Sequence, residues 1–417
     1  MKIIKFLILI CLLANPVLGQ DIYVGISAYG RQQMDIAVLP FLSSREMEST
    51  ADHMTAILNF DLNYSLYFSL LEDFELPGYS DVFTLKWDKL NQLGAEAIIA
   101  CKISSTREGL ELNALIVDPY SESVLFQRSY SGPTDKYRNL VHQLSDDVVE
   151  VLTGETGIFT SRIAYVRKGG QTSSIRICDY DGYEDQVYAS KNTLNLSPFW
   201  DKSDQVYFTS YYSGKPDIVK STSDGFTPVA ANGNLNIGGE ISPRGDYIAY
   251  ACNIDGNTDI YIKSLSSGEI RRLTFSAAID CSPTWAPSGM QLAFTSDRGG
   301  SPQIYVVNAD GSGIRLLTTG GGYNTSPVWS PRGDRIVFVG NYEGLFQLFS
   351  ISPTGDNLRQ LTSLGQNEDP SWSADGLHLV FSSNRTGTYK LYTMNFDGTS
   401  IRELISSPGS IMPAWSF

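Results

Sequence analysis

Three histidines are the side chains of this sequence best suited to acid–base catalysis at neutral pH. His53 and His142 fall in segments with helical periodicity, which predicts positions on the surface or flank of a helix. His378 falls in a strand. The string nearest to the G-x-S-x-G nucleophile motif runs from Gly25 to Tyr29, but it ends in the wrong residue. A Ser-His-Asp triad is therefore not expected.

The sequence also lacks the usual signatures of nucleotide and metal sites. It contains no Walker A string, no G-x-G-x-x-G after a strand and no HExxH. The acidic string from Asp179 to Asp185 resembles part of a calcium loop. However, its Asp181-Gly182 pair occupies a turn position that recurs along the chain, so a structural turn explains it better. We predict no catalytic residue, cofactor or metal, and therefore no enzyme.

The elements that carry these residues are organised by an internal repeat. The stretch from Asp280 to Thr318 holds four strand signals separated by three turn signals, APSG, DRGGSP and DGSG. The turn before the last strand recurs every 43 or 44 residues, at positions 181, 224, 267, 310, 354 and 397. An anchor recurs every 41 to 44 residues, at Trp200, Ile241, Trp285, Trp329, Trp372 and Trp415. Six copies of a four-stranded unit predict an all-β six-bladed β-propeller over residues 158–417.

The two ends of the repeat predict how the propeller closes. The first copy has a strand from Ser161 to Val166 but no SPxW string ahead of it. The chain ends on a strand of that type, Met412 to Phe417, with no repeat after it. We expect this C-terminal strand to become the innermost strand of the first blade, because that pairing removes the last open edge.

The part of the chain ahead of the repeat has a different pattern. Residues 1–19 predict a secretory signal peptide, because two lysines precede an apolar run too short to span a bilayer. Cleavage is expected after Gly19. Residues 34–154 alternate strands with helices, which predicts an α/β domain with a mixed sheet. No later segment approaches eighteen apolar residues, so direct membrane insertion is not expected.

Charge and cysteine usage narrow the function further. The formal net charge is −14, and losing the two lysines of the signal peptide makes it −16, which argues against nucleic acid and favours solubility or a basic partner. The register of the repeat is compatible with a disulfide between Cys252 and Cys281. The alternation of apolar and polar residues instead favours small buried residues at Cys101, Cys178, Cys252 and Cys281.

A polar residue recurs five positions ahead of each anchor. Because this position precedes the inner strand, symmetry predicts a ring around one mouth of the central channel. The next residue along the chain varies freely, as expected of a specific binding surface. Asx turns explain the polar residues equally well, and the two interpretations can coexist. The ring residues are Asn195, Asn236, Asp280, Asn324, Asn367 and Ser410.

Several strings occur in an order that is typical of one family. They are a signal peptide, DIAVLPF, LGAEAIIACKI, LTGETGIFTSRIAYV, the blade motif SPxWSPxGxxIxF and a closing PAWSF. Together they resemble the TolB family, the periplasmic component of the Tol-Pal envelope system. The resemblance implies a monomeric, non-enzymatic interaction protein of the periplasm that contributes to outer-membrane integrity and to envelope constriction at cell division.

The resemblance also implies two partners. The outer-membrane lipoprotein Pal would dock over the propeller mouth, and the inner-membrane protein TolA would bind a mobile N-terminal arm, residues 20–33. In the arm, the apolar alternation suits an adding strand or an ordinary first strand of the α/β domain. The implied TolA contacts are Asp21, Ile22, Tyr23, Val24 and Ile26. The implied Pal contacts are Asn195, Asn236, Ile237, Gly238, Asp280, Cys281, Asn324, Thr325, Asn367, Glu368 and Ser410.

Two other functions compete with this interpretation. An exported propeller enzyme, either a peptidase or a glycan-active enzyme, needs a clustered base and nucleophile, which the sequence does not show. A glycan-binding propeller would be favoured by exposed aromatic residues at the ring positions, where asparagine and aspartate occur instead. The blade around Ile241 departs from the family pattern, with Gly238-Gly239-Glu240-Ile241 in place of SPxW.

Overall fold

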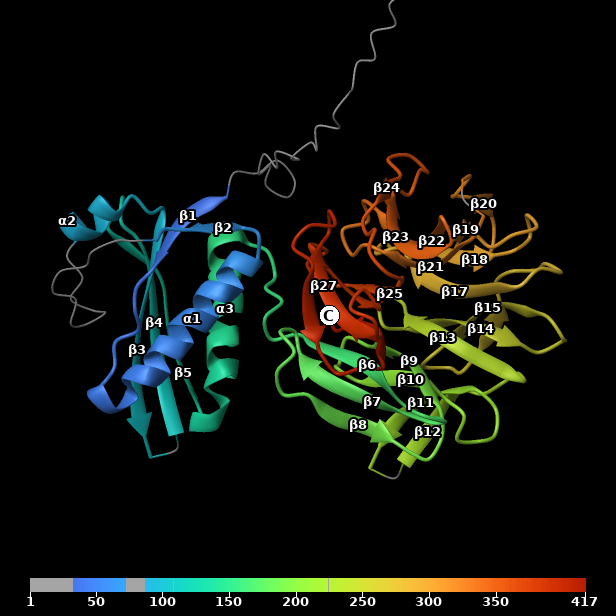
Figure 1. Cartoon of the computed structure of the whole chain (residues 1–417), viewed down its shortest axis with the longest axis horizontal. Coiled ribbons are helices and arrows are strands. Elements are labelled where there is room, and N and C mark those ends of the chain that lie inside the picture. The colour runs from blue at the N-terminus through green and yellow to red at the C-terminus, as the bar shows by residue number, and fades with distance from the viewer. Residues whose placement is uncertain (1–32, 73–86, 108, 224, 321) are drawn as a thin grey trace, which may run out of the picture.

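The computed structural model describes residues 33–72, 87–107, 109–223, 225–320 and 322–417. The signal peptide and all but the last residue of the N-terminal arm, including the implied TolA contacts, lie outside the described residues. Two domains lie side by side, an α/β domain and a β-propeller (Figure 1). Within the described ranges, no helix combines the length and the apolar content that a bilayer crossing needs.

The α/β domain is built on a mixed five-stranded sheet in the order β2-β1-β3-β4-β5. Strand β1 pairs in parallel with β2 and β3, and the long hairpin of β4 and β5 completes the sheet. Helices α1 and α3 cover one face through apolar residues spaced by four, such as Leu58 and Leu62 in α1 and Leu144 and Val148 in α3. Helix α3 ends where Gly154 adopts a left-handed conformation. The elements are β1 (Met34–Val38), α1 (Glu48–Tyr64), β2 (Phe68–Leu70), α2 (Trp87–Leu90), β3 (Ala97–Thr106), β4 (Gly109–Asp118), β5 (Ser123–Gly132) and α3 (Tyr137–Thr153), with short 3₁₀ turns at Arg45–Met47, Asn91–Leu93 and Thr134–Lys136.

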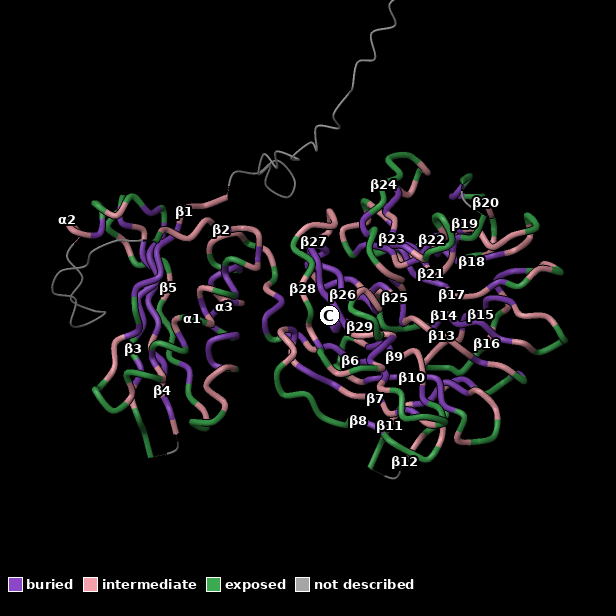
Figure 2. The backbone as a smooth tube through the Cα atoms, viewed as in Figure 1, coloured by how far each residue is buried: buried purple, intermediate pink, exposed green. Residues whose placement is uncertain are grey.

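The propeller consists of six antiparallel four-stranded sheets, as the repeat predicts. Blade 1 has the order β29-β6-β7-β8, so the C-terminal strand closes the ring and the closure prediction is confirmed. Figure 2 shows buried residues along the strands and exposed residues in the connecting loops.

Blade 1 contains β29 (Ser410–Trp415), β6 (Arg162–Gly169), β7 (Thr172–Asp179) and β8 (Gln186–Ser190). Blade 2 contains β9 (Asn195–Trp200), β10 (Val206–Ser210), β11 (Asp217–Thr222) and β12 (Gly225–Ala230), and blade 3 contains β13 (Leu235–Ile241), β14 (Tyr247–Asn253), β15 (Thr258–Ser264) and β16 (Ile270–Arg272). Blade 4 contains β17 (Asp280–Trp285), β18 (Gln291–Ser296), β19 (Gln303–Asn308) and β20 (Arg315–Leu316). Blade 5 contains β21 (Asn324–Trp329), β22 (Ile336–Tyr342), β23 (Leu345–Ile351) and β24 (Arg359–Gln360), and blade 6 contains β25 (Asn367–Trp372), β26 (His378–Ser383), β27 (Lys390–Asn395) and β28 (Arg402–Ile405).

Strand direction gives the propeller two different faces. The loop face carries the starts of the inner strands, the loops between second and third strands, and the connections between blades. The turn face carries the tight turns after the first and third strands. Asp181, Arg332 and Asp375 lie in such turns, and the first two contact the α/β domain. Among the described residues, these contacts place the α/β domain at the turn face of the propeller.

The anchor tryptophans join neighbouring blades. The indole N–H of Trp200 donates to the carbonyl of Ala414, 2.9 Å away, and that of Trp372 donates to Val328 at 3.2 Å. Blade 3 lacks this tryptophan and has Ile241 in its place. There Ile241 and Phe199 of blade 2 belong to one apolar cluster, and a Cβ on Gly239 would lie only 2.9 Å from Phe199 Cζ. The departure from SPxW in blade 3 is thus a packing exchange within the channel wall.

Candidate functional site

The six ring residues are buried at the loop face. Asn195, Asn236, Asp280, Asn367 and Ser410 have no exposed surface, and Asn324 is 4% exposed. Five of them are the first residue of an inner strand and Asn236 is the second residue of β13, so the ring lies at the start of the inner strands and not just ahead of them. Their side chains are turned into the protein, so they do not offer direct contacts to a partner. Their role in partner binding remains a prediction, and it would act through the position of neighbouring residues.

Four of the ring amides tie each inner strand to the preceding blade. Asn236 Nδ2 donates to Asp217 Oδ1 at 3.0 Å, and Asn324 Nδ2 donates to Gln303 Oε1 at 2.7 Å. Asn367 repeats the second bond with Gln347 at 2.8 Å, and Asn195 donates to the carbonyl of Ser173 at 2.7 Å. Buried amides with satisfied hydrogen bonds fix the spacing of blades. These four bonds link blades and are not local Asx turns, so they give the amides a structural role that neither interpretation had included.

Two ring positions have no amide, Asp280 and Ser410, and at each of them an arginine binds the ring side chain. Arg298 Nη2 lies 2.8 Å from Asp280 Oδ2 and forms an ion pair with this fully buried carboxylate. Arg167 donates to Ser410 Oγ at 3.0 Å. These contacts hold the two arginines at the loop face, where the charge of Arg298 is balanced by Asp280.

The residues that follow the ring are more accessible. Ile237, Gly238, Cys281, Thr325 and Glu368 are all half-buried. Glu368 Oε2 accepts a hydrogen bond from the Tyr389 hydroxyl at 2.7 Å, which fixes its carboxylate. Gly238 has φ of 52°, and serines, an aspartate and a methionine take the same left-handed conformation at the equivalent position of the other blades. A partner at this mouth would meet these residues first.

The loops and strand ends of the loop face carry a set of exposed apolar side chains. The most exposed are Phe275 at 72% and Leu364 at 63%. Exposed apolar side chains that share one face of a protein often mark a surface that binds a partner. Sequence reasoning missed this set, although loop residues such as Leu364 stand out as apolar in a polar connection. Its described members are Leu194, Tyr211, Ile254, Phe275, Ile279, Tyr323, Tyr342, Leu345 and Leu364.

All four described cysteines are free thiols. The Cys252 thiol donates to Asn236 Oδ1 at 3.2 Å and so belongs to the buried hydrogen-bond network of Asn236. Cys281 is half-buried, and burial raises the pKa of its thiol. The structure favours the interpretation of these residues as small packed side chains over the disulfide.

The sequence predicts His142 on the surface or the flank of a helix, and the structure excludes the surface. Its side chain is 2% exposed and lies between two carboxylates of different domains, with Nδ1 2.8 Å from Asp61 Oδ2 and Nε2 3.5 Å from Asp181 Oδ2. Burial alone lowers the pKa of His142, but hydrogen bonds and charges from Asp181 and Asp61 outweigh burial and raise it to about 9. The Tyr180 hydroxyl also donates to Asp61, and Arg138 pairs with Asp181. His142 therefore acts as a buried cation that joins the α/β domain to blade 1.

The other two histidines have different environments. His53 is exposed on α1, as predicted. His378 is fully buried, and its Nε2 lies 2.8 Å from the Tyr64 carbonyl of the α/β domain. Its ring also stacks on Tyr64 with centroids 4.0 Å apart. Neither setting gives a substrate access to an imidazole beside a nucleophile.

The acidic string in blade 1 is explained by the domain interface. Asp181 pairs with Arg138 and His142, and Gly182 has φ of 90°, which suits the tight turn. Across the described ranges, no group of three or more His, Cys, Asp or Glu is arranged to hold a metal ion. The turn interpretation of this string is supported.

An α/β domain joined through a buried ionic contact to a closed six-bladed propeller defines a class of two-domain propeller proteins. Family models agree: one described as "TolB amino-terminal domain" matches residues 22–124, and one described as "TolB beta propeller domain" matches residues 149–417. The second covers more than half of the chain. The chain belongs to the TolB family.

Individual relatives agree with this assignment. The "Tol-Pal system protein TolB" of Desulfosudis oleivorans is 34% identical over 279 residues, which is 64% of each chain. The "Protein TolB homolog" of Chlorobium chlorochromatii is 32% identical over 66% of this chain and 64% of its own. These alignments span somewhat less than two thirds of the relatives' length. A crystal structure of TolB from Acinetobacter baumannii has a TM-score of 0.76 at 26% identity and covers 93% of this chain and 97% of that one.

Proposed function

We propose that this chain is a periplasmic docking protein of a Tol-Pal system, without catalytic activity of its own. In this proposal the loop face of the propeller binds a Pal-like outer-membrane lipoprotein, and the N-terminal arm binds a TolA-like inner-membrane protein. Exchange between these two partners would support outer-membrane integrity and envelope constriction during division. Relatives named for the Tol-Pal system support the proposal.

The observation that carries it is the set of exposed apolar side chains on the loop face. Phe275 and Leu364 expose most of their surface on this side, while the α/β domain occupies the turn face. Exposed apolar residues together with a few charged groups of fixed position are typical of a protein-binding surface. Arg298 and Glu368 provide those charges, and their hydrogen bonds fix their positions.

The test measures binding of the mature chain to the soluble domain of the Pal-like lipoprotein from the same organism. Leu364→Asp is expected to weaken binding by about tenfold or more, because a charge replaces an apolar contact in the desolvated part of the interface. Leu358→Asp is the matched control, since Leu358 is 58% exposed in a turn of the opposite face. Equal affinities for the two variants, or no binding by the unmutated chain, would contradict the proposal.

The second partner is tested with a chain that begins at Met34. Removing residues 20–33 is expected to abolish capture of the periplasmic domain of the TolA-like protein while the folded propeller still binds the lipoprotein. Retained capture would show that the TolA-like contact lies elsewhere.

A further inference from the structure

A recess lies on the turn face of the propeller, between blades 3 and 4. Its volume is about 450 Å³, within the range of small-molecule sites in proteins. Blade 3 contributes the turn from Ser242 to Tyr247 and the segment from Ser264 to Arg271, and blade 4 contributes Trp285 and the turn at Ser288 to Met290. The docking surfaces of the proposed function do not include these residues.

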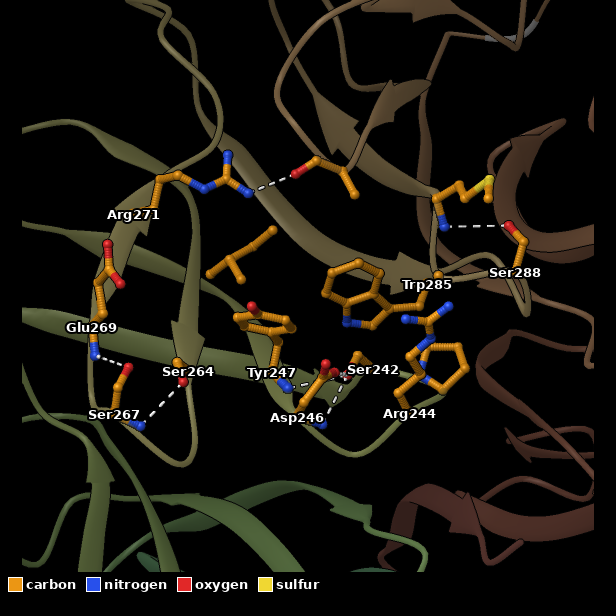
Figure 3. A pocket seen from close by; sticks show the side chains of 15 residues that line it. Ser242, Arg244, Asp246, Tyr247, Ser264, Ser267, Glu269, Arg271, Trp285 and Ser288 are labelled. Atoms are coloured by element: carbon orange, nitrogen blue, oxygen red, sulfur yellow. Dashed lines mark hydrogen bonds between the residues drawn. The ribbon is translucent and has the colours of Figure 1, made fainter.

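An exposed aromatic ring forms the middle of this recess. Figure 3 shows the Tyr247 ring there, with Trp285 on one side and Glu269 on the other. Tyr247 is 42% exposed, whereas Trp285 is only 4% exposed. At the position of Tyr247 the other five blades have two arginines, two glutamines and a buried histidine: Arg162, Arg335, Gln205, Gln291 and His378. The ring is therefore a special feature of blade 3 and not a requirement of the repeat.

Two guanidinium groups and two carboxylates surround the Tyr247 ring. Arg244 and Arg271 face the recess together with Asp246 and Glu269, so their formal charges cancel. Arg271 Nη2 donates to the Ala309 carbonyl at 2.6 Å, which holds the guanidinium in place. Within the described part of the chain, the side chains of Arg244 and Glu269 make no hydrogen bond or ion pair. Two exposed polar groups thus remain available to a ligand.

The same turn in blade 5 shows what such an arginine does when a partner covers it. Blades 3 and 5 share the string SPRGD, so Arg332 stands where Arg244 stands. Arg332 Nη2 donates to the hydroxyl of Tyr67 at 2.9 Å and lies 3.7 Å from Glu155, both from the part of the chain ahead of the propeller. The turn therefore presents a guanidinium that can bind a hydroxyl oxygen.

We propose that this recess binds a short, uncharged saccharide. A pyranose ring has an apolar face that would pack on Tyr247, in the way that aromatic rings contact flat apolar groups. Its hydroxyls would donate to Glu269 and Asp246 and accept from Arg244 and Arg271, since carboxylates only accept and guanidinium groups only donate. The balanced charge of the site favours a neutral ligand over an anionic or cationic one.

The test titrates the mature chain with chitotriose, cellotriose and the fully deacetylated chitosan trimer, followed by calorimetry and by saturation-transfer NMR. We expect one or both neutral trimers to bind and the cationic trimer to bind at least about tenfold more weakly. Tyr247→Ala is expected to lower the affinity about tenfold or more, whereas Tyr247→Phe keeps the ring and keeps the affinity within about threefold. Glu269→Gln is expected to lower it as well, because a neutral amide accepts a weaker hydrogen bond.

The control is Tyr342→Ala, which removes a tyrosine of similar exposure, 50%, from the loop face. This variant is expected to bind saccharide normally, and Tyr247→Ala is expected to bind the Pal-like domain normally. The saccharide recess and the surface proposed for the Pal-like domain can therefore be tested independently of each other. No binding of either neutral trimer, binding that survives Tyr247→Ala, or binding of a charged tripeptide in place of saccharide would overturn the inference.

Discussion

At the scale of single residues, His142 has the clearest consequence for stability. Its pKa is raised to about 9 by Asp181 and Asp61, above the ordinary value of 6.5. A raised folded-state pKa gives stability that is fully present below pH 6.5 and is lost as the pH rises through 9. The linked free energy is on the order of 3 kcal/mol. We predict that unfolding free energy falls between pH 6.5 and pH 10 in the unmutated chain.

Comparing His142→Gln with the unmutated chain isolates this effect from other groups that titrate at high pH. The variant is expected to be less stable at pH 6 and to converge on the unmutated chain near pH 10, as measured by urea unfolding. His53→Asn, at an exposed position, is the control and should follow the unmutated chain at every pH. A His142 resonance that titrates near 6.5 in NMR would contradict the assignment.

At the scale of elements, the closing strand β29 decides whether the propeller is a ring. It pairs with β6 from Ser410 opposite Arg167 to Trp415 opposite Ile163, and it buries Trp415 in the core shared with the α/β domain. A chain that ends at Gly409 is expected to lose unfolding free energy. The loss should be well over ~3 kcal/mol, the value typical of deleting one buried tryptophan. The shortened chain would also expose the edge of β6.

Urea unfolding and gel filtration check this prediction. The shortened chain should unfold at lower denaturant and associate, because an open strand edge pairs with other chains. A chain lacking only Phe417, which is 57% exposed, should behave as the unmutated protein. A monomeric shortened chain of unchanged stability would show that closure by β29 is dispensable.

Elements were far more predictable than side-chain environments. The blade count, the closure through the C-terminus and the α/β domain follow from periodicity, because each strand repeats one local pattern. The burial of Asn324 and Asn367 did not follow, since their partners Gln303 and Gln347 belong to the preceding blade. Likewise, His142 has a helical spacing that fits a helix flank, and only the contact between domains buries it.

At the scale of the whole molecule, the two domains share a buried apolar core, and a few defined polar and aromatic side chains join them as well. Arg402 lies 4.1 Å from the centre of the Tyr64 ring, and Arg332 bonds to Tyr67. Together with the His142 contact, these interactions hold the α/β domain against blades 1, 5 and 6. The loop face is on the other side of the propeller. Binding at that face should therefore not depend on how tightly the domains are joined.

We predict that the double variant Arg332→Ala, Arg402→Ala loosens the domains without weakening binding of the Pal-like domain. Small-angle scattering should show a larger radius of gyration, and amides near Tyr64 should exchange faster, because two cationic contacts across the interface are lost. The lipoprotein affinity should stay within about twofold, since the apolar set around Phe275 and Leu364 is unchanged. A tenfold loss of affinity would instead mean that the α/β domain forms part of the docking surface or controls its shape.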